Sequence, residues 1–333
     1  MHTGRSFARL TLIMVMLAPL VSCAFFDELA AVRTFKDANL LYGRGDYEGA
    51  IEEYGEVLMV LETDPDNDLL KTAYFYIANS YDNLYRPGVR NDPENEGYLN
   101  DAIRFYELAA EEITEPSLRT LSMQYLVAAF GPDKRNDPSS SEPILRDMIQ
   151  IDPGNPDNYF ALAKLYEDAG LYEDAEAVMI EVRNMRGDDP IVYLQLAGFY
   201  SRAGEFEQTI DALEQRAAIE PDNPEAYYTI STYYWEKAFR DFRITQEEKS
   251  QYIMAGLEAV DQAIDLNDRY VDALVYKNIL LRMQANMISC EDTDDIECIS
   301  FQEGLIAEAD DFRNRAEELQ KQQQQGAAAA GGQ

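Results

Sequence analysis

The sequence is poor in histidine, the side chain on which much acid–base and metal chemistry near neutral pH depends. Its one histidine, His2, lies in an N-terminal segment that we expect to be removed, for reasons given below. Without histidine, catalysis of the Ser-His, Cys-His and zinc-water types is excluded. Close carboxylate pairs are inevitable among 62 acidic residues, so their presence does not indicate a catalytic site. We expect a protein that is not an enzyme and that uses no cofactor and no metal ion.

Basic residues are also few. The 333-residue chain has 28 lysines and arginines against 62 aspartates and glutamates, and its formal net charge is −34. Such a surface repels nucleic acid and anionic lipid headgroups. The sequence contains no local basic patch that would overcome this repulsion, so nucleic acid is excluded as a partner.

Long apolar runs are missing after residue 23, so no later segment is predicted to cross a bilayer. The exception begins with Arg5 and Arg9, continues with a largely apolar stretch over Leu10–Val21, and ends with Ser22 and Cys23. As a helix, about 12 residues would span only about half of the hydrocarbon core. This order of charged, apolar and small residues predicts an export signal rather than a permanent transmembrane anchor.

The residues Leu20, Val21, Ser22 and Cys23 resemble the lipobox of bacterial lipoproteins, in which small residues precede a cysteine at the cleavage site. The resemblance implies a lipoprotein signal peptide over residues 1–23 and a diacylglycerol on the Cys23 sulfur. Two or three acyl chains, at about 0.8 kcal/mol per buried CH₂, would hold the protein at a membrane. Ala24, in place of an aspartate, implies by analogy the outer membrane, with the protein facing the periplasm.

Cys290 and Cys298 are the other two cysteines, and they lie close together in the sequence. In an exported protein such a pair favours a disulfide. Because the closed loop is short, we expect the bond to contribute about 2–3 kcal/mol to stability. Metal binding by this pair is less favoured, because no histidine remains to complete a site.

A repeat with a fixed period organises the middle of the chain. Two adjacent copies place apolar residues at helical spacing, then a turn glycine, then a second amphipathic segment. The first contains Tyr159, Leu162, Ala163, Tyr166, Gly170, Tyr172, Ala175, Met179 and Val182, and the second contains Tyr193, Leu196, Ala197, Tyr200, Gly204, Phe206, Thr209 and Leu213. Each copy therefore predicts a hairpin of two helices, which the small Ala163 or Ala197 allows to pack closely.

Weaker copies flank these two. They start near Ala38, Tyr74, Ser117 and Pro224. The copies at Tyr74 and Pro224 delay their second helix, which predicts one loop around Pro87–Tyr98 and another that contains Phe242. Thr245 with Glu248 predicts a capping box at the second helix of the last copy.

The C-terminal part predicts a helix over about Tyr270–Met287, then the cysteine-bearing loop, then a polar helix over about Phe301–Gln320 that caps the repeats. Residues 321–333 are rich in glutamine, alanine and glycine and cannot bury enough apolar surface to order themselves. We expect this tail to be disordered.

The spacing, the residue types and the linkers at Asp152–Pro156 and Pro221–Pro224 resemble the tetratricopeptide repeat (TPR) over roughly residues 33–285. The resemblance implies an all-α, right-handed superhelical solenoid of TPR-type helical hairpins, about six to seven in number. With the capping helix this domain would occupy residues 24–320.

Such a solenoid presents a concave face lined by the first helix of each hairpin. The family register and the second insertion predict a partner-binding groove of Phe35, Asn39, Tyr42, Phe75, Asn79, Phe160, Lys164, Arg202, Tyr228, Trp235 and Phe242. Aromatic groove residues would suit peptide recognition. The alternative is that tight winding buries these rings between neighbouring helices, or that an inserted loop packs against its own neighbour.

Asn39 and Asn79 are similar to asparagines with which some TPR proteins hold a terminal carboxylate. That clamp also needs lysine and arginine on successive first helices. Phe35 and Phe75 stand at the equivalent places, so a carboxylate-terminated peptide is a poor candidate ligand.

These observations predict a membrane-anchored periplasmic lipoprotein that acts as a scaffold, holding other envelope proteins or peptides together. The alternative is a ligand-binding accessory lipoprotein of a solute (TRAP-type) transporter, which a closed apolar cavity would favour. A carboxylate-based hydrolase of envelope glycans is the weakest hypothesis.

Overall fold

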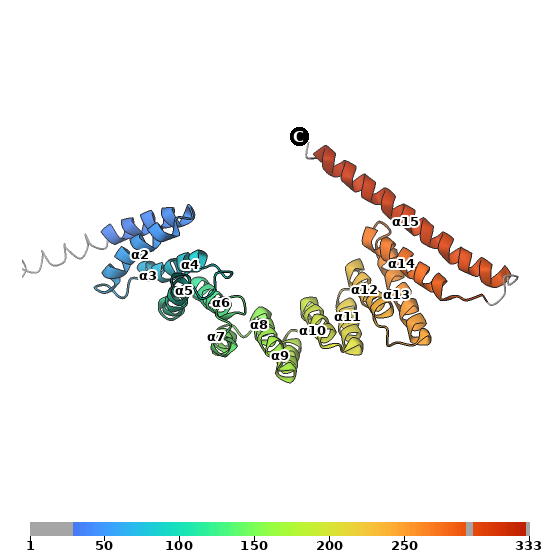
Figure 1. The fold of residues 1–333 in the computed structure, drawn as a ribbon, viewed down its shortest axis with the longest axis horizontal. Helices are drawn as coiled ribbons and strands as arrows, with labels where there is room; N and C mark the ends of the chain where they lie inside the picture. The colour runs from blue at the N-terminus through green and yellow to red at the C-terminus, as the bar shows by residue number, and fades with distance from the viewer. Residues whose placement is uncertain (1–28, 291–295, 331–333) are drawn as a thin grey trace, which may run out of the picture. The chain divides into compact units, whose positions relative to one another are not determined.

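The computed structural model describes residues 29–290 and 296–330, and every regular element in these ranges is a helix (Figure 1). The predicted signal segment and Cys23 lie outside the described residues. The chain divides into two compact units, residues 1–178 and 179–333. The prediction of an all-α fold built from repeated helices is confirmed.

The N-terminal unit consists of antiparallel helices joined by short loops. Its elements are a first helix over residues 29–43, then α2 (Tyr47–Leu61), α3 (Asp68–Lys71), α4 (Ala73–Leu84), α5 (Pro93–Glu112), α6 (Pro116–Phe130), α7 (Pro138–Ile151), α8 (Pro156–Asp168) and the first half of α9 (Tyr172–Met185). Along the chain α4 packs on α5, α5 on α6, α6 on α7, and α7 on α8. From α4 to α8 each helix thus contacts the next one along the chain, as expected for a repeat.

The C-terminal unit continues the same pattern with longer helices. It comprises the rest of α9, α10 (Pro190–Ala203), α11 (Phe206–Ile219), α12 (Pro224–Arg240), α13 (Gln246–Leu266), α14 (Val271–Met287) and α15 (Ile296–Ala330). The helix pairs α10–α11, α12–α13 and α14–α15 make its most extensive contacts.

Local sequence signals explain where the hairpins begin and turn. Asn155 and Asn223 each accept a hydrogen bond from a backbone N–H of the next helix, and a proline occupies the first helical position after each. Gly170 and Gly204 occupy the turns of the two central hairpins with φ of 75° and 82°. A side chain would strain that left-handed conformation, so glycine allows the tight turn.

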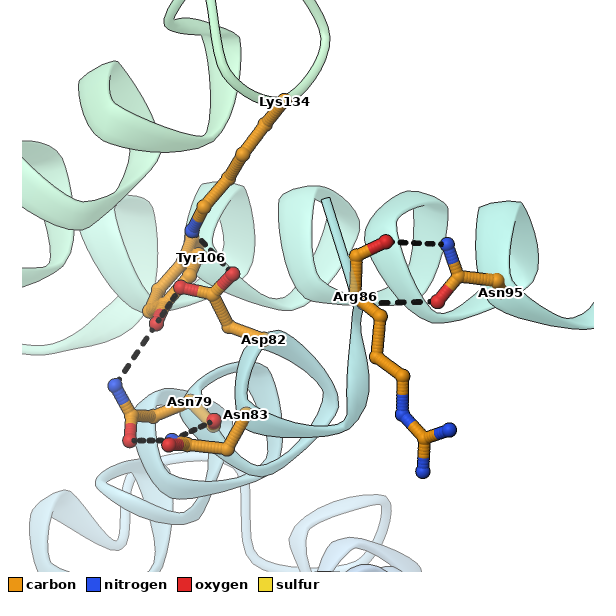
Figure 2. Close-up of polar contacts among 7 residues, drawn as sticks. All are labelled: Asn79, Asp82, Asn83, Arg86, Asn95, Tyr106 and Lys134. Atoms are coloured by element: carbon orange, nitrogen blue, oxygen red, sulfur yellow. Dashed lines mark hydrogen bonds and ion pairs between the residues drawn. The ribbon is translucent and has the colours of Figure 1, made fainter. Parts of the chain in front are cut away.

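The loop formed by the first insertion is shorter than the sequence predicts. The expected loop over Pro87–Tyr98 ends early, because Asp92 caps a helix that begins at Pro93. The buried Asn95, within the extra helical turn, accepts from the Arg86 backbone N–H (2.8 Å) and donates to the backbone oxygens of Arg86 (3.1 Å) and Val89 (2.7 Å). Figure 2 shows the two bonds to Arg86. The added residues therefore stabilise the preceding loop through these hydrogen bonds.

The second insertion also lengthens its helices, since α12 runs to Arg240 and α13 starts at Gln246. Only residues 241–245 remain as a loop. The predicted capping box is confirmed: Thr245 and Glu248 exchange hydrogen bonds between side chain and backbone.

The C-terminal helix α15 packs along α14. Leu274 of α14 meets Ala316 and Leu319 of α15, and the predicted pair Cys290 and Cys298 is joined by a disulfide with Cα atoms 5.8 Å apart. The helix also extends through residues 321–330, where we predicted disorder. Glutamine and alanine favour helix, and an established helix extends without a new nucleus, which accounts for this continuation.

Within residues 29–290 and 296–330, no helix is both long enough and apolar enough to span a membrane.

Candidate partner-binding surfaces

The predicted groove residues differ widely in exposure. Phe35, Phe75 and Asn79 are buried; Asn39, Tyr42, Phe160, Tyr228 and Trp235 are partly buried; Lys164, Arg202 and Phe242 are exposed. Only part of the set can therefore contact a partner directly.

Phe35 and Phe75 are packing residues, which corrects the prediction that they face solvent. The Phe35 ring lies 5.7 Å from that of Tyr54, edge to face. The Phe75 ring lies 6.1 Å from that of Tyr106 and 5.8 Å from that of Tyr125 on α6. Both phenylalanines are thus enclosed by tyrosines from neighbouring helices, which is the alternative that the sequence left open.

Asn79 lies at the centre of a polar network in the N-terminal unit (Figure 2). Its amide oxygen accepts from the Tyr42 hydroxyl (2.7 Å) and from the Asn83 amide (2.9 Å), and its amide nitrogen donates to the Tyr106 hydroxyl (3.1 Å). Tyr106 in turn donates to Asp82 (3.4 Å). Since its amide is already bonded at both ends, Asn79 joins helices rather than offering itself to a ligand.

Contacts of the loop between α6 and α7 extend this network. Lys134, in the loop between α6 and α7, forms an ion pair with Asp82 of α4 (Figure 2). Arg90, in the loop between α4 and α5, donates to the backbone oxygen of Pro132 (3.4 Å), and Arg135 donates to Asn100. The first insertion therefore packs against the neighbouring repeat and is not a free binding loop.

Burial of the tyrosines in this unit predicts a loss of stability at alkaline pH. Burial, followed by the Asp82 charge, raises the pKa of Tyr106, and burial likewise raises the pKa of Tyr54. In the unfolded chain these phenols ionise near pH 10. Above that pH the folded state holds more protons, so its stability is full below about pH 10 and falls as the pH rises toward the folded values.

Replacing Tyr106 by phenylalanine should make this alkaline decline shallower, because one phenol with a raised pKa is removed. Unfolding free energies from urea titrations on both sides of about pH 10 measure the decline. Tyr172→Phe, at an exposed tyrosine, is the matched control. An unchanged slope in Tyr106→Phe would contradict the assignment.

The C-terminal unit carries an aromatic surface that remains partly open. Trp235 stacks on Phe239 one turn later on α12, with centroids 5.4 Å apart, and its ring meets Tyr276 of α14 edge to face. Tyr228 contacts Tyr270 and Tyr276, and burial raises the pKa of Tyr228 to about 12. We call these five residues the α12–α14 aromatic face.

Phe239 gives the α12–α14 aromatic face an accessible edge, since it is 58% exposed. Beneath it the Trp235 Nε1 atom is buried and has no hydrogen-bond partner within the part of the chain that the structure describes. A rigid aromatic pair with one exposed ring offers a large contact area at low entropic cost.

A cavity of about 480 Å³ lies beside the second insertion. It is lined by Ser201, Gly204, Phe206, Thr209, Tyr233, Glu236, Lys237, Arg240, Asp241, Phe242 and Arg243, so its walls come from the α10–α11 turn, the end of α12 and the α12–α13 loop. Phe242 is 95% exposed, so the second insertion does not bury its aromatic residue against its own repeat.

The sequence did not identify several residues of these surfaces. Tyr270 and Tyr276 were missed because apolar and polar residues alternate around α14 and mark no clear face. Phe206 and Tyr233 were missed as cavity walls because nothing in the local sequence indicates that the α10–α11 turn reaches the α12–α13 loop. Among the residues that the structure describes, no group of three or more acidic, histidine or cysteine side chains could hold a metal ion.

Comparison with protein families matches residues 134–197 to the tetratricopeptide repeat. The match covers the loop before α7, the helices α7 to α9 and the start of α10. The expected resemblance to this repeat is confirmed for these residues. No curated protein matches the chain.

Several solved structures are similar at low sequence identity. MamA is 18% identical, with 57% of this chain and 93% of that chain covered and a TM-score of 0.39. YrrB, described as a TPR protein with an unusual peptide-binding site, is also 18% identical over 60% of this chain and 91% of that one, with a TM-score of 0.38. The C-terminal part of a TPR repeat-containing protein from Cytophaga hutchinsonii is 15% identical over 86% of this chain and 98% of that one, with a TM-score of 0.48.

Proposed function

We propose that this protein is a lipid-anchored scaffold of the bacterial cell envelope. Cys23 attaches it to the outer membrane, and its repeats bind other envelope proteins or peptides in the periplasm. The lipobox-like residues Leu20–Cys23 support the anchor. The observation that best supports the binding function is the α12–α14 aromatic face, where the exposed Phe239 ring rests on Trp235.

The tetratricopeptide repeat favours a scaffold over an enzyme, because each hairpin exposes side chains on its surface without enclosing a reaction chamber. Aromatic residues that project from such a surface are the usual anchors of protein–protein interfaces. A scaffold of this kind would bind its partners through such side chains and would need no cofactor.

A transporter accessory with an apolar small-molecule pocket has less support. The cavity beside the second insertion has a volume within the usual range for ligand pockets, about 300–1,000 Å³. However, it is open to solvent, and five of its lining residues are charged. A closed, apolar chamber would be the expected feature of that function.

The anchor is tested by replacing Cys23 with alanine in the producing cell. We expect the variant to lose its acyl mass and to leave the membrane fraction, because no thiol remains for the diacylglycerol. Mass spectrometry of the purified chain and fractionation of the cells measure both. Retention of the Cys23→Ala protein in the membrane would disprove the anchor.

Partner binding is tested by purifying the protein from gently solubilised envelopes and identifying what accompanies it. We expect a stoichiometric protein partner that is lost in Phe239→Ala and kept in Phe301→Ala. These phenylalanines are 58% and 59% exposed, so the control removes an equal ring from α15. A bound small molecule without a protein would favour the transporter accessory instead.

A further inference from the structure

The geometry of the cavity beside the second insertion points to a second docking site, separate from the α12–α14 aromatic face. We infer that this cavity binds a protein segment that carries an aromatic or large apolar side chain next to a carboxylate. The inference rests on the proposed function only in taking the partner to be a protein.

Phe242 stands at the mouth of the cavity and is held there by an ordered loop. The Asp241 carboxylate accepts from the Arg243 backbone N–H (3.0 Å), from the Arg243 guanidinium (2.9 and 3.0 Å) and from the Lys237 ammonium (3.0 Å). These bonds hold the pKa of Asp241 well below its usual range, so the carboxylate stays ionised. The capping box at Thr245 fixes the other end of the loop.

Because both ends of the loop are fixed, the backbone that carries Phe242 has little conformational freedom to lose on binding. A lone exposed phenylalanine is common on protein surfaces. A phenylalanine that a five-residue loop projects over a cavity is placed as expected for an interface anchor.

Other lining residues supply aromatic surface. Phe206 is held by Tyr234 and Tyr252, whose ring centroids lie 5.7 and 5.2 Å away, and the Lys237 ammonium lies 5.1 Å from the Phe206 centroid. Tyr233 also lines the cavity. An apolar side chain that enters from solvent would therefore be enclosed by Phe206, Tyr233 and Phe242.

The rim supplies positive charge on an otherwise acidic chain. Three cations line the cavity, Lys237, Arg240 and Arg243, against two anions, Glu236 and Asp241. The side chains of Arg240 and Arg243 are 67% and 88% exposed, so their guanidinium groups lie at the rim. Each pairs with one carboxylate, but a guanidinium has five N–H donors and can bind a second.

A carboxylate is therefore the complementary group for the partner. Elsewhere the net charge of −34 repels an acidic segment, and at physiological salt that repulsion is screened beyond about 8 Å. A segment that combines an acidic group with an aromatic anchor is attracted by the rim and fits the cavity.

The test begins with a phage-displayed random peptide library, selected on the purified full chain. We expect the enriched peptides to carry an aromatic or large apolar residue within two positions of an aspartate or glutamate. Fluorescence anisotropy with the strongest labelled peptide should then show binding weakened about tenfold or more by Phe242→Ala and by the double change Arg240→Gln and Arg243→Gln. Phe301→Ala should leave it unchanged.

Because Phe242 is almost fully exposed, Phe242→Ala should fold normally, and an unchanged thermal unfolding curve verifies this. Absence of enrichment, enrichment of basic peptides, or binding that is insensitive to Phe242→Ala would overturn the inference. So would a monomer–dimer equilibrium that Phe242→Ala abolishes, because the occupant would then be a second copy. A partner lost in Phe239→Ala but kept in Phe242→Ala would preserve the proposed function while refuting this site.

Discussion

Replacing Leu274 by alanine should destabilise the C-terminal unit by about 3–4 kcal/mol. Leu274 is fully buried in a small cluster with Val271 of α14 and with Ala316 and Leu319 of α15. Ile264, Val275 and Phe312 also pack against this cluster, and packed side chains move only partly into a vacated space, so a cavity is expected to remain. In a repeat array each helix depends mainly on its neighbours, so the loss should fall on α14 and α15.

Hydrogen exchange followed by mass spectrometry measures this local effect. We expect faster exchange in α14 and α15 of Leu274→Ala and no change in the N-terminal unit. Leu266→Ala is the control, because Leu266 is 42% exposed and its truncation leaves no buried cavity. Equal acceleration along the whole chain would contradict a locally determined stability.

The second large effect is expected for Asn79→Ala, at about 2 kcal/mol. The change removes three side-chain hydrogen bonds, those with Tyr42, Asn83 and Tyr106. Tyr106 is fully buried, so water cannot easily replace the lost donor. The helix propensity of alanine exceeds that of asparagine and offsets part of the loss.

Asn83→Ala is the matched control, one turn further along α4. Asn83 bonds to the same Asn79 side chain and to its backbone oxygen, but it is exposed, so water can replace its bonds. We expect it to cost less than about 1 kcal/mol. Equal losses in denaturant titrations of the two variants would show that Asn79 is not the centre of the network.

The sequence predicted the central hairpins well because their signals are local. The Asn155 and Asn223 caps, the prolines that follow them and the glycines at 170 and 204 each act within a few residues. The capping box at Thr245 was predictable for the same reason. The length of α15 was not predictable, since its low-complexity tail resembles a disordered segment in composition.

The candidate site was harder to predict, because exposure depends on residues far apart in the chain. Phe75 and Phe242 are both aromatic and both belong to repeats with an insertion. Phe75 is buried because Tyr106 and Tyr125 enclose it. Phe242 is exposed on a loop in which the Arg243 backbone N–H donates to Asp241. No local pattern distinguishes the two.

By itself the sequence determined the helical class, the hairpin period and the turns, because apolar spacing, caps and glycines act over one or two helical turns. The tertiary structure decided which aromatic rings are packing residues and which are available for binding. It did so because burial is set by the side chains that neighbouring helices and loops bring to a ring, and those neighbours are distant in the sequence.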